Sequence, residues 1–232
     1  MEERDSVRRF TKLAGLYLIL SLSLLAEPYD RLSHAEVARK VQDRYEKIEN
    51  YQASFTINGR GGKTMTGTAY YRAPANLSFD FSNPAGNRIV SDGKTLWIKI
   101  ARLNAVGKQD LTLKPKEGER DIFSVAPGPG LKRLFNRYHY KFDKKEQPRD
   151  IDGKPCYVLE MEQKEKVGGF EHILLYVDSE KFLVYKAEAT DGTGETTTIT
   201  LKNIRTDIQL EGKVFQFQPD DNDQIVANPL VE

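Results

Sequence analysis

The hydrophobic pattern of the chain has a short part with helical spacing and a long part that alternates as strands do. Ser33 and Glu36 form a capping-box pattern, and apolar residues then recur at helical spacing as far as Ile48. We therefore expect an amphipathic helix over residues 34–49. After Tyr51 the period changes to two, which is typical of strands with one buried face.

The alternating part predicts a series of short strands separated by Gly, Pro, Asn and Asp turns. Asp92-Gly93, between two apolar runs, is typical of a tight hairpin. Residues 114–130 are charged and then rich in Pro and Gly, which argues against regular structure, and a short helix is expected over 131–136. Long helices do not alternate with the strands, so the pattern favours an antiparallel, mainly β fold. The expected strands are 51–59, 64–73, 76–82, 87–91, 95–101, 108–113, 138–144, 155–163, 170–178, 181–190, 194–205 and 212–218.

One face of the predicted sheet is bulky and apolar on many strands, whereas the other carries polar residues such as Asp80 and Lys99. The helical material is scarce for so wide a sheet, so a filled core and a partly unfilled apolar cavity both remain open. The candidates for a cavity lining are Leu77, Phe79, Phe81, Leu96, Ile98, Ile100, Tyr157, Leu159, Met161, Ile173 and Leu175. The candidates for part of a cover are Leu131, Leu134, Phe135 and the loop 126–130.

The first 26 residues differ from the rest of the chain. Arg8, Arg9 and Lys12 precede an uncharged, leucine-rich run over 13–26, which is how a secretory signal is built. As a helix that run would span about 21 Å, short of the roughly 30 Å hydrocarbon core. We expect a signal peptide over 1–26, with cleavage after either Ser23 or Ala26. A short uncleaved anchor or a buried core helix is the alternative. The remaining residues, 27–232, form the expected single domain.

Composition narrows the function further. The 35 Lys and Arg against 34 Asp and Glu leave no basic excess for nucleic acid. A single cysteine, Cys156, excludes a disulfide within the chain and a cysteine-cluster metal site, and a buried thiol is expected. The three histidines lack metal-ligand spacing, and no phosphate loop or nucleophile elbow occurs. We therefore expect no cofactor and no metal, and nothing in the sequence argues for an enzyme.

A local signature then becomes recognisable. The block from Gly67 to Phe79 (GTAYYRAPANLSF) leads through Asn83-Pro84 to the hairpin Val90–Trp97 (VSDGKTLW). It resembles the central signature of the periplasmic outer-membrane lipoprotein carrier family (LolA). The resemblance covers about residues 34–226, and its further matching pieces are Leu175–Asp178, the Thr-rich strand to Ile204, and Val214–Pro219.

The resemblance implies an incomplete antiparallel β-barrel of about eleven strands, closed by an N-terminal helix and a short helical lid. It also implies a monomeric periplasmic carrier that binds the acyl chains of lipoproteins. Such a carrier would receive its cargo from an inner-membrane lipoprotein-releasing transporter and deliver it to an outer-membrane acceptor. Related folds also serve as envelope regulators and carriers of other lipids, so the fold does not settle the cargo. A lipid-sensing regulatory module and, less favoured, an exported hydrolase are the alternatives.

One position departs from the family pattern. Members commonly place Arg directly before the Pro, where it bonds to lid segments. Here Ala73 precedes Pro74, and the basic residue is Arg72, one step earlier. One step along a strand reverses the face to which a side chain points. We include Arg72 among the lid candidates on the strength of the resemblance alone.

Overall fold

The computed structural model describes residues 32–111, 129–166 and 168–227. The body that begins at Ser33 holds all of the helices and strands in these ranges. The expected signal peptide at 1–26 and nearly all of the predicted loop at 114–130 lie outside the described residues. Within the described ranges, no helix combines the length and the apolar composition needed to cross a lipid bilayer.

The first described helix, α2 (His34–Glu46), begins as the sequence predicts. The Ser33 hydroxyl accepts a hydrogen bond from the Glu36 amide at 3.2 Å, and the Glu36 carboxylate accepts one from the Ser33 amide at 2.8 Å. The bond from the Ser33 amide, and a second one that the Ser33 hydroxyl donates to the Glu36 carboxylate at 2.7 Å, lower the pKa of Glu36. The helix ends at Glu46, three residues before the expected position 49. Lys47 caps it, and the chain turns there before β1 begins at Asn50. A second described helix, α3 (Pro129–Arg137), includes the predicted 131–136.

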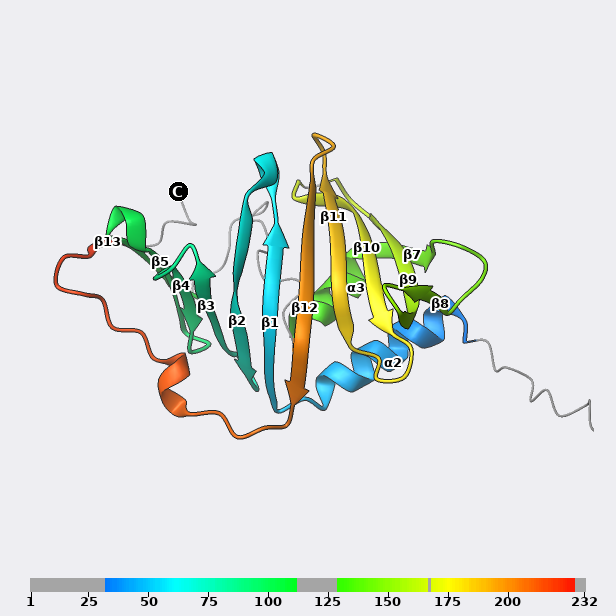
Figure 1. Ribbon diagram of the computed structural model, residues 1–232, viewed down its shortest axis with the longest axis horizontal. Coiled ribbons are helices and arrows are strands. Elements are labelled where there is room, and N and C mark those ends of the chain that lie inside the picture. The colour runs from blue at the N-terminus through cyan, green and yellow to red at the C-terminus, as the bar shows by residue number, and fades with distance from the viewer. Residues whose placement is uncertain (1–31, 112–128, 167, 228–232) are drawn as a thin grey trace, which may run out of the picture. The chain divides into compact units, whose positions relative to one another are not determined.

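Within the described ranges, thirteen strands form one sheet that runs in the order β13-β6-β5-β4-β3-β2-β1-β12-β11-β10-β9-β7, with β8 paired to β9 (Figure 1). All neighbours are antiparallel except β13 and β6, which are parallel. The fold is therefore mainly β and mostly antiparallel, as expected of an incomplete barrel. The described sheet has thirteen strands rather than about eleven, and it stays open. The strands are β1 Asn50–Asn58, β2 Thr64–Arg72, β3 Asn76–Asn83, β4 Arg88–Ser91, β5 Thr95–Ile100, β6 Ala105–Asp110, β7 Tyr138–Phe142, β8 Arg149–Ile151, β9 Lys154–Gln163, β10 Phe170–Asp178, β11 Val184–Asp191, β12 Thr196–Thr206 and β13 Gln224–Ala227.

Three parts of the strand prediction need correction. The predicted strand at 212–218 is wrong, because this segment begins with a 3-10 turn, Gly212–Phe215, and pairs with no described strand. Its apolar residues alternate as in a strand, but their side chains pack against a face of the sheet. Strand β6 covers 105–110 rather than 108–113, and the short strands β8 and β13 were not predicted.

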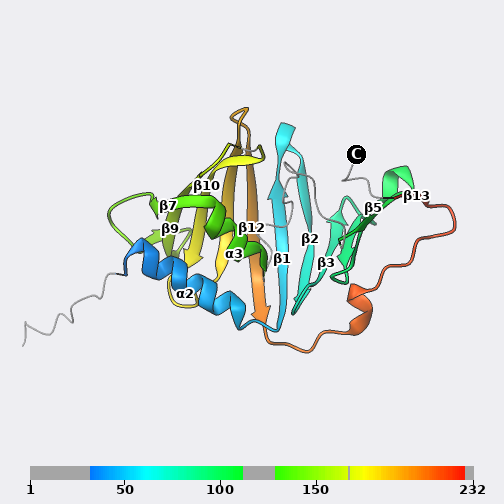
Figure 2. The same ribbon diagram turned by 180° about the vertical axis from the view of Figure 1, so that it is seen from behind.

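The two helices lie across one face of the sheet, in front of β7–β12 (Figure 2). We call this the inner face and the opposite one the outer face. His34 of α2 meets the rings of Tyr140 and Phe142 edge-on at 6.0 and 5.9 Å, and the Tyr45 hydroxyl accepts a hydrogen bond from the Val184 amide at 3.1 Å. These contacts attach α2 to the β7–β11 part of the inner face.

Gly67 is required by the aromatic packing on the inner face. The Phe55 ring lies over Gly67 and meets Phe79 and Phe81 edge-on, with ring centres 5.5 and 5.1 Å away. A Cβ at position 67 would lie 2.7 Å from the Phe55 ring and would collide with the carbonyl oxygen of Asp80. Strand β2 can therefore pass beneath Phe55 only without a side chain at this position.

We expect Gly67→Ala to lower the free energy of unfolding by about 3 kcal/mol, the upper end of the usual cost of overpacking. Urea unfolding of the purified variant measures this. Gly212→Ala is the matched control, because a Cβ there meets nothing within 4 Å and its φ is not positive. A Gly67 variant as stable as the control would contradict the packing described here.

Candidate functional site

The inner face carries apolar residues in rows that cross the sheet from strand to strand. Strand register places one residue from each of seven neighbouring strands directly side by side. Only one member of this row, a glycine, lacks a side chain. The row consists of Ala53, Ala69, Phe79, Ile89, Ile98, Gly107 and Val226.

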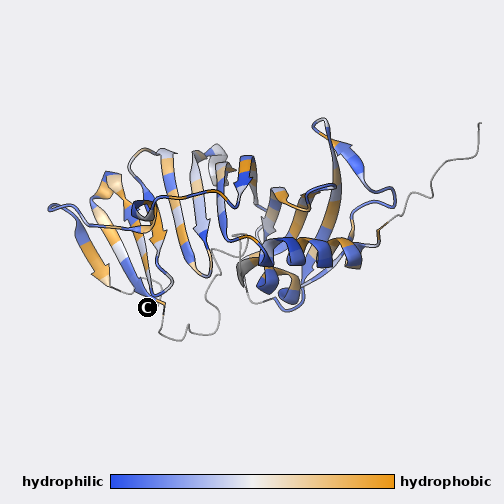
Figure 3. Cartoon of the chain, turned by 90° about the horizontal axis from the view of Figure 1, so that it is seen from below, coloured by the Kyte–Doolittle hydropathy of each residue, from blue (hydrophilic) through white to orange (hydrophobic). Residues whose placement is uncertain are grey.

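This row lies where the described helices do not cover the sheet. Figure 2 shows α2 and α3 in front of β7–β12 and neither of them in front of β2–β5, and Figure 3 shows apolar residues along these uncovered strands. Phe79, Phe81 and Ile98 are only half-buried, and Ile100 is 41% exposed. We call the inner face of β2–β6 and β13 the open face. At the β1 end of the row, Ala53 and Ala69 are buried, at 0% and 6%.

The sequence candidates for a cavity lining therefore divide into two groups. Those on β9 and β10 have exposed fractions of 6% or less, so they belong to a packed core on the helix-covered side. Leu77 and Leu96, on the uncovered side, are also buried, at 8% and 1%. Of the candidates for an apolar lining, those that remain accessible to a ligand are Phe79, Phe81 and Ile98 and the exposed Ile100. The five β9 and β10 candidates are Tyr157, Leu159, Met161, Ile173 and Leu175.

The lid candidates on α3 are its anchors to the inner face. Leu131, Leu134 and Phe135 have exposed fractions of 1%, 1% and 4%, and the Phe135 ring meets Tyr140 edge-on at 5.4 Å. Sequence reasoning placed these three in a cover for the apolar face, and α3 does lie over that face (Figure 2). That α3 moves to admit a ligand stays a prediction.

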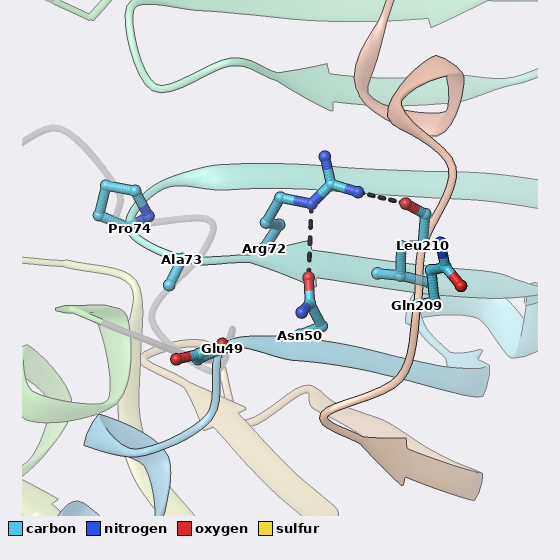
Figure 4. Close-up of a pocket in the computed structure, with 7 residues that line it drawn as sticks. All are labelled: Glu49, Asn50, Arg72, Ala73, Pro74, Gln209 and Leu210. Atoms are coloured by element: carbon cyan, nitrogen blue, oxygen red, sulfur yellow. Dashed lines mark hydrogen bonds between the residues drawn. The ribbon is translucent and has the colours of Figure 1, made fainter.

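Arg72 lies on the outer face, opposite to Tyr71. Its Nε donates a hydrogen bond to Asn50 at 3.4 Å, and its terminal nitrogen donates one to the carbonyl oxygen of Leu210 (Figure 4). The guanidinium also lies 4.8 Å from the centre of the Phe215 ring. Among the described residues these contacts join Arg72 to the chain after β12 and to β1, and none joins it to α2 or α3. Because the basic residue stands one position earlier than in the family pattern, its side chain points to the outer face, away from the helices.

A shallow cleft of about 540 Å³ opens beside Arg72. Its walls come from the junction between α2 and β1, the end of β2 with the turn that follows it, and the chain after β12 (Figure 4). Apart from Arg72 and Glu49 it contains no ionisable side chain, so it presents no arrangement for acid–base or nucleophilic chemistry. The lining residues are Glu49, Asn50, Arg72, Ala73, Pro74, Gln209 and Leu210.

The segment 207–223, which we call the strap, follows β12 and returns to the β2–β6 part of the sheet (Figure 1). Phe217 stacks on Trp97 with ring centres 5.3 Å apart, and Arg88 donates a hydrogen bond to the carbonyl oxygen of Val214 at 3.4 Å. Phe215 is only 6% exposed. The strap therefore covers the outer face of the same strands whose inner face is open. Three outer-face side chains there, at most 1% exposed, are Ser78, Val90 and Val106.

An ionic contact fixes the end of the strap. The Lys99 ammonium pairs with Asp220 and, at 2.9 Å, with Asp223, whose side chain is 2% exposed. The hydrogen bond from Lys99 lowers the pKa of Asp223, and the bonds to Asp220 and Asp223 raise the pKa of Lys99. Sequence reasoning missed this contact, because more than 120 residues separate the partners and neither stands in a motif.

The described residues contain no group of three His, Cys, Asp or Glu side chains that could hold a metal ion. Cys156 is fully buried beside Val158, Tyr176 and Tyr185 on the outer face, and burial raises the pKa of its thiol. The prediction of a buried thiol is confirmed. Such a thiol is held in its unreactive, protonated form.

The family model for the outer membrane lipoprotein carrier protein LolA matches residues 46–218. An uncharacterized protein of Methanocaldococcus jannaschii is 27% identical over 91% of this chain. The match spans 61% of that relative's own length. An outer-membrane lipoprotein carrier protein of Methylococcus capsulatus is 25% identical over 88% of this chain and 93% of its own.

Two solved structures share the fold. A conserved uncharacterized protein of Thermus thermophilus superimposes with a TM-score of 0.55, at 15% identity, over 82% of this chain and 98% of its own. MucB in the Pseudomonas aeruginosa MucA/MucB complex superimposes with a TM-score of 0.51, at 14% identity, over 83% of this chain and 62% of its own. At such identities the likeness concerns the fold alone.

We expect Asp223→Asn to lower the melting temperature at neutral pH. Because the pKa of Asp223 is depressed in the fold, its ionised form stabilises the fold above the ordinary value of 3.8, and this contribution is lost as the pH falls through the depressed pKa. The difference from wild type should therefore stay constant between about pH 7 and about pH 5 and shrink as the pH falls below about 4. Thermal unfolding across that range measures it. Asp221→Asn, a nearby exposed carboxylate, is the control, and an equal effect of both variants would contradict the role of the ion pair.

Proposed function

The chain belongs to the outer membrane lipoprotein carrier protein family, and we propose that its open face binds the acyl chains of lipoproteins for transport through the periplasm. The observation that carries the proposal is the part of the apolar row from Phe79 to Val226, which is at least partly exposed and which the described helices leave uncovered. An apolar patch of this kind on a sheet marks a place for an apolar ligand. The covered outer face supports the proposal, because it allows the same strands to remain folded when the open face is empty.

In this proposal the chain is exported by its first 26 residues and binds lipid without chemistry. Its partners are acylated lipoproteins, an inner-membrane transporter that releases them and an outer-membrane acceptor. The family name and the Methylococcus capsulatus relative support this assignment.

A regulatory module that senses lipid is the second candidate, and one observation favours it. MucB, which shares the fold, has been solved in complex with MucA(peri), and this chain spans 61% of that protein's length. A regulator would hold a protein partner stably, whereas a carrier would exchange its acylated cargo between membranes. Transfer of a labelled lipoprotein from donor to acceptor vesicles distinguishes the two.

We expect the purified protein to contain bound acyl compounds. Organic extraction followed by mass spectrometry should find fatty acids, phospholipids or acylated peptides. Their molar ratio to the protein should approach one. After delipidation, the protein should take up a fluorescent palmitoyl probe in a saturable manner. A preparation that carries no acyl compound and does not bind the probe would contradict the proposed function.

A carboxylate on the open face should separate binding from folding. We expect Ile98→Glu to weaken uptake of the palmitoyl probe by about tenfold or more, because an unpaired charge must then be desolvated against the acyl chain. The half-buried position allows the carboxylate to reach water when the site is empty, so thermal unfolding should change little. Titration with the probe and calorimetry of the same sample measure the two effects.

Two further variants serve as controls for that experiment. Leu159→Glu places the charge in the fully buried core under the helices and should abolish folding. Thr56→Glu places it on the outer face of β1, between Thr66 and Thr200, and should change neither property. Unchanged uptake in Ile98→Glu would remove the open face from the binding site.

A further inference from the structure

Among the described residues, strand β13 forms an unprotected edge of the sheet. It is the terminal strand beyond β6, and no described strand pairs with its far side. All four of its residues are exposed, including Ile225 at 53% and Val226 at 49%. Sheet edges in proteins are normally protected by Lys, Pro, a bulge or a covering element. The four residues of β13 include no Lys or Pro, and its register with β6 is unbroken.

The pairing with β6 determines which backbone groups point outward. The backbone amide of Gln224 donates a hydrogen bond to the carbonyl oxygen of Asn104 at 2.7 Å, so the N–H and C=O groups of Gln224 point toward β6. Along a strand paired on one side, successive residues turn their amide and carbonyl groups to opposite sides. The backbone N–H and C=O groups of Val226 therefore also point toward β6, whereas those of Ile225 and Ala227 point away from the sheet.

The side chains of β13 connect this edge to the open face. Val226 lies beside Gly107, which lies beside Ile98, so Val226 continues the apolar row of the inner face. Ile100, at the end of β5 and two strands away from β13, lies on the same face and is 41% exposed. A strand added outside β13 would lie about 4.8 Å further along the same surface. An acyl chain on the open face and a peptide at this edge would thus be adjacent.

We propose that the outward edge of β13 pairs with the extended polypeptide segment next to the acyl group of the cargo. This inference rests on the proposed function and names the part of the cargo that the site recognises besides lipid. Ile225 and Ala227 would supply the hydrogen bonds, as in other cases of strand addition. Because these bonds involve the cargo backbone, the edge would accept lipoproteins of different sequence.

The small size of the edge favours a lipid-tethered peptide over a second copy of this chain. Stable interfaces bury at least about 1,200 Å², and pairing between two four-residue strands falls far below that area. A peptide attached to a bound acyl chain needs much less, because the attachment makes its pairing intramolecular. Two or three added backbone hydrogen bonds should then strengthen binding by about tenfold.

The test compares two probes on the delipidated full chain. One probe is a palmitoylated hexapeptide of Ser and Thr, and the other is palmitoyl amide without a peptide. We expect the peptide probe to bind about tenfold more tightly. A version of the peptide probe that is N-methylated at alternate residues should lose this advantage, because its backbone cannot donate to the edge.

Two variants at one position separate backbone from side chain. Ile225→Pro removes the outward amide without touching the hydrogen bonds to β6, and we expect it to abolish the peptide advantage but leave binding of palmitoyl amide unchanged. Ile225→Ala keeps the amide and should keep the advantage. If Ile225→Pro does not fold, the N-methylated probe on the wild-type protein decides the question.

Each contrary result has a distinct meaning. Equal affinity of the wild type for both probes, or an advantage retained in Ile225→Pro, would overturn the inference while leaving acyl binding intact. A dimer in sedimentation that Ile225→Pro dissociates, with no peptide advantage, would show that a second copy occupies the edge and would also overturn it. Absence of binding to palmitoyl amide would overturn the proposed function itself, and the inference with it.

Discussion

The structure depends on one constraint, which is that a thirteen-stranded sheet with an apolar inner face has two described helices with which to cover it. Both helices pack over β7–β12, where Leu159, Met161 and Leu175 are fully buried. The remaining strands keep their apolar residues on the same face but lack a helical cover in the described chain. Residues with the same pattern thus form a core on one side and an open surface on the other.

An open apolar face is a liability unless something else holds its strands together. The strap provides this support from the opposite side, where Phe217 stacks on Trp97 and Lys99 pairs with Asp223. The strap thereby buries apolar side chains on the outer face of these strands, which stabilises them. The inner face can then stay empty without collapsing, since the stiff rings of Phe55 and Phe79 also resist closure.

The sequence was sufficient for features that depend on local pattern. The capping box at Ser33, the hairpin at Asp92-Gly93 and the mainly antiparallel sheet all follow from spacing and turn chemistry, and the structure confirms them. The segment 212–218 was beyond this reasoning, because Phe215 and Phe217 alternate as strand residues do while they pack on a distant strand. Which half of the apolar face remains open was equally inaccessible, since it is decided by where two helices dock.

The half-open face also limits how strongly an acyl chain can be held. Full burial of a sixteen-carbon chain would contribute about 12 kcal/mol, at about 0.8 kcal/mol per CH₂, and two or three such chains would not leave on a useful timescale. On the open face, Phe79 and Ile98 contact one side of a chain and leave the other side free. Binding of this kind protects lipid from water only in part and remains reversible. A protein that must both accept and release acylated cargo needs this compromise, which a closed core could not provide.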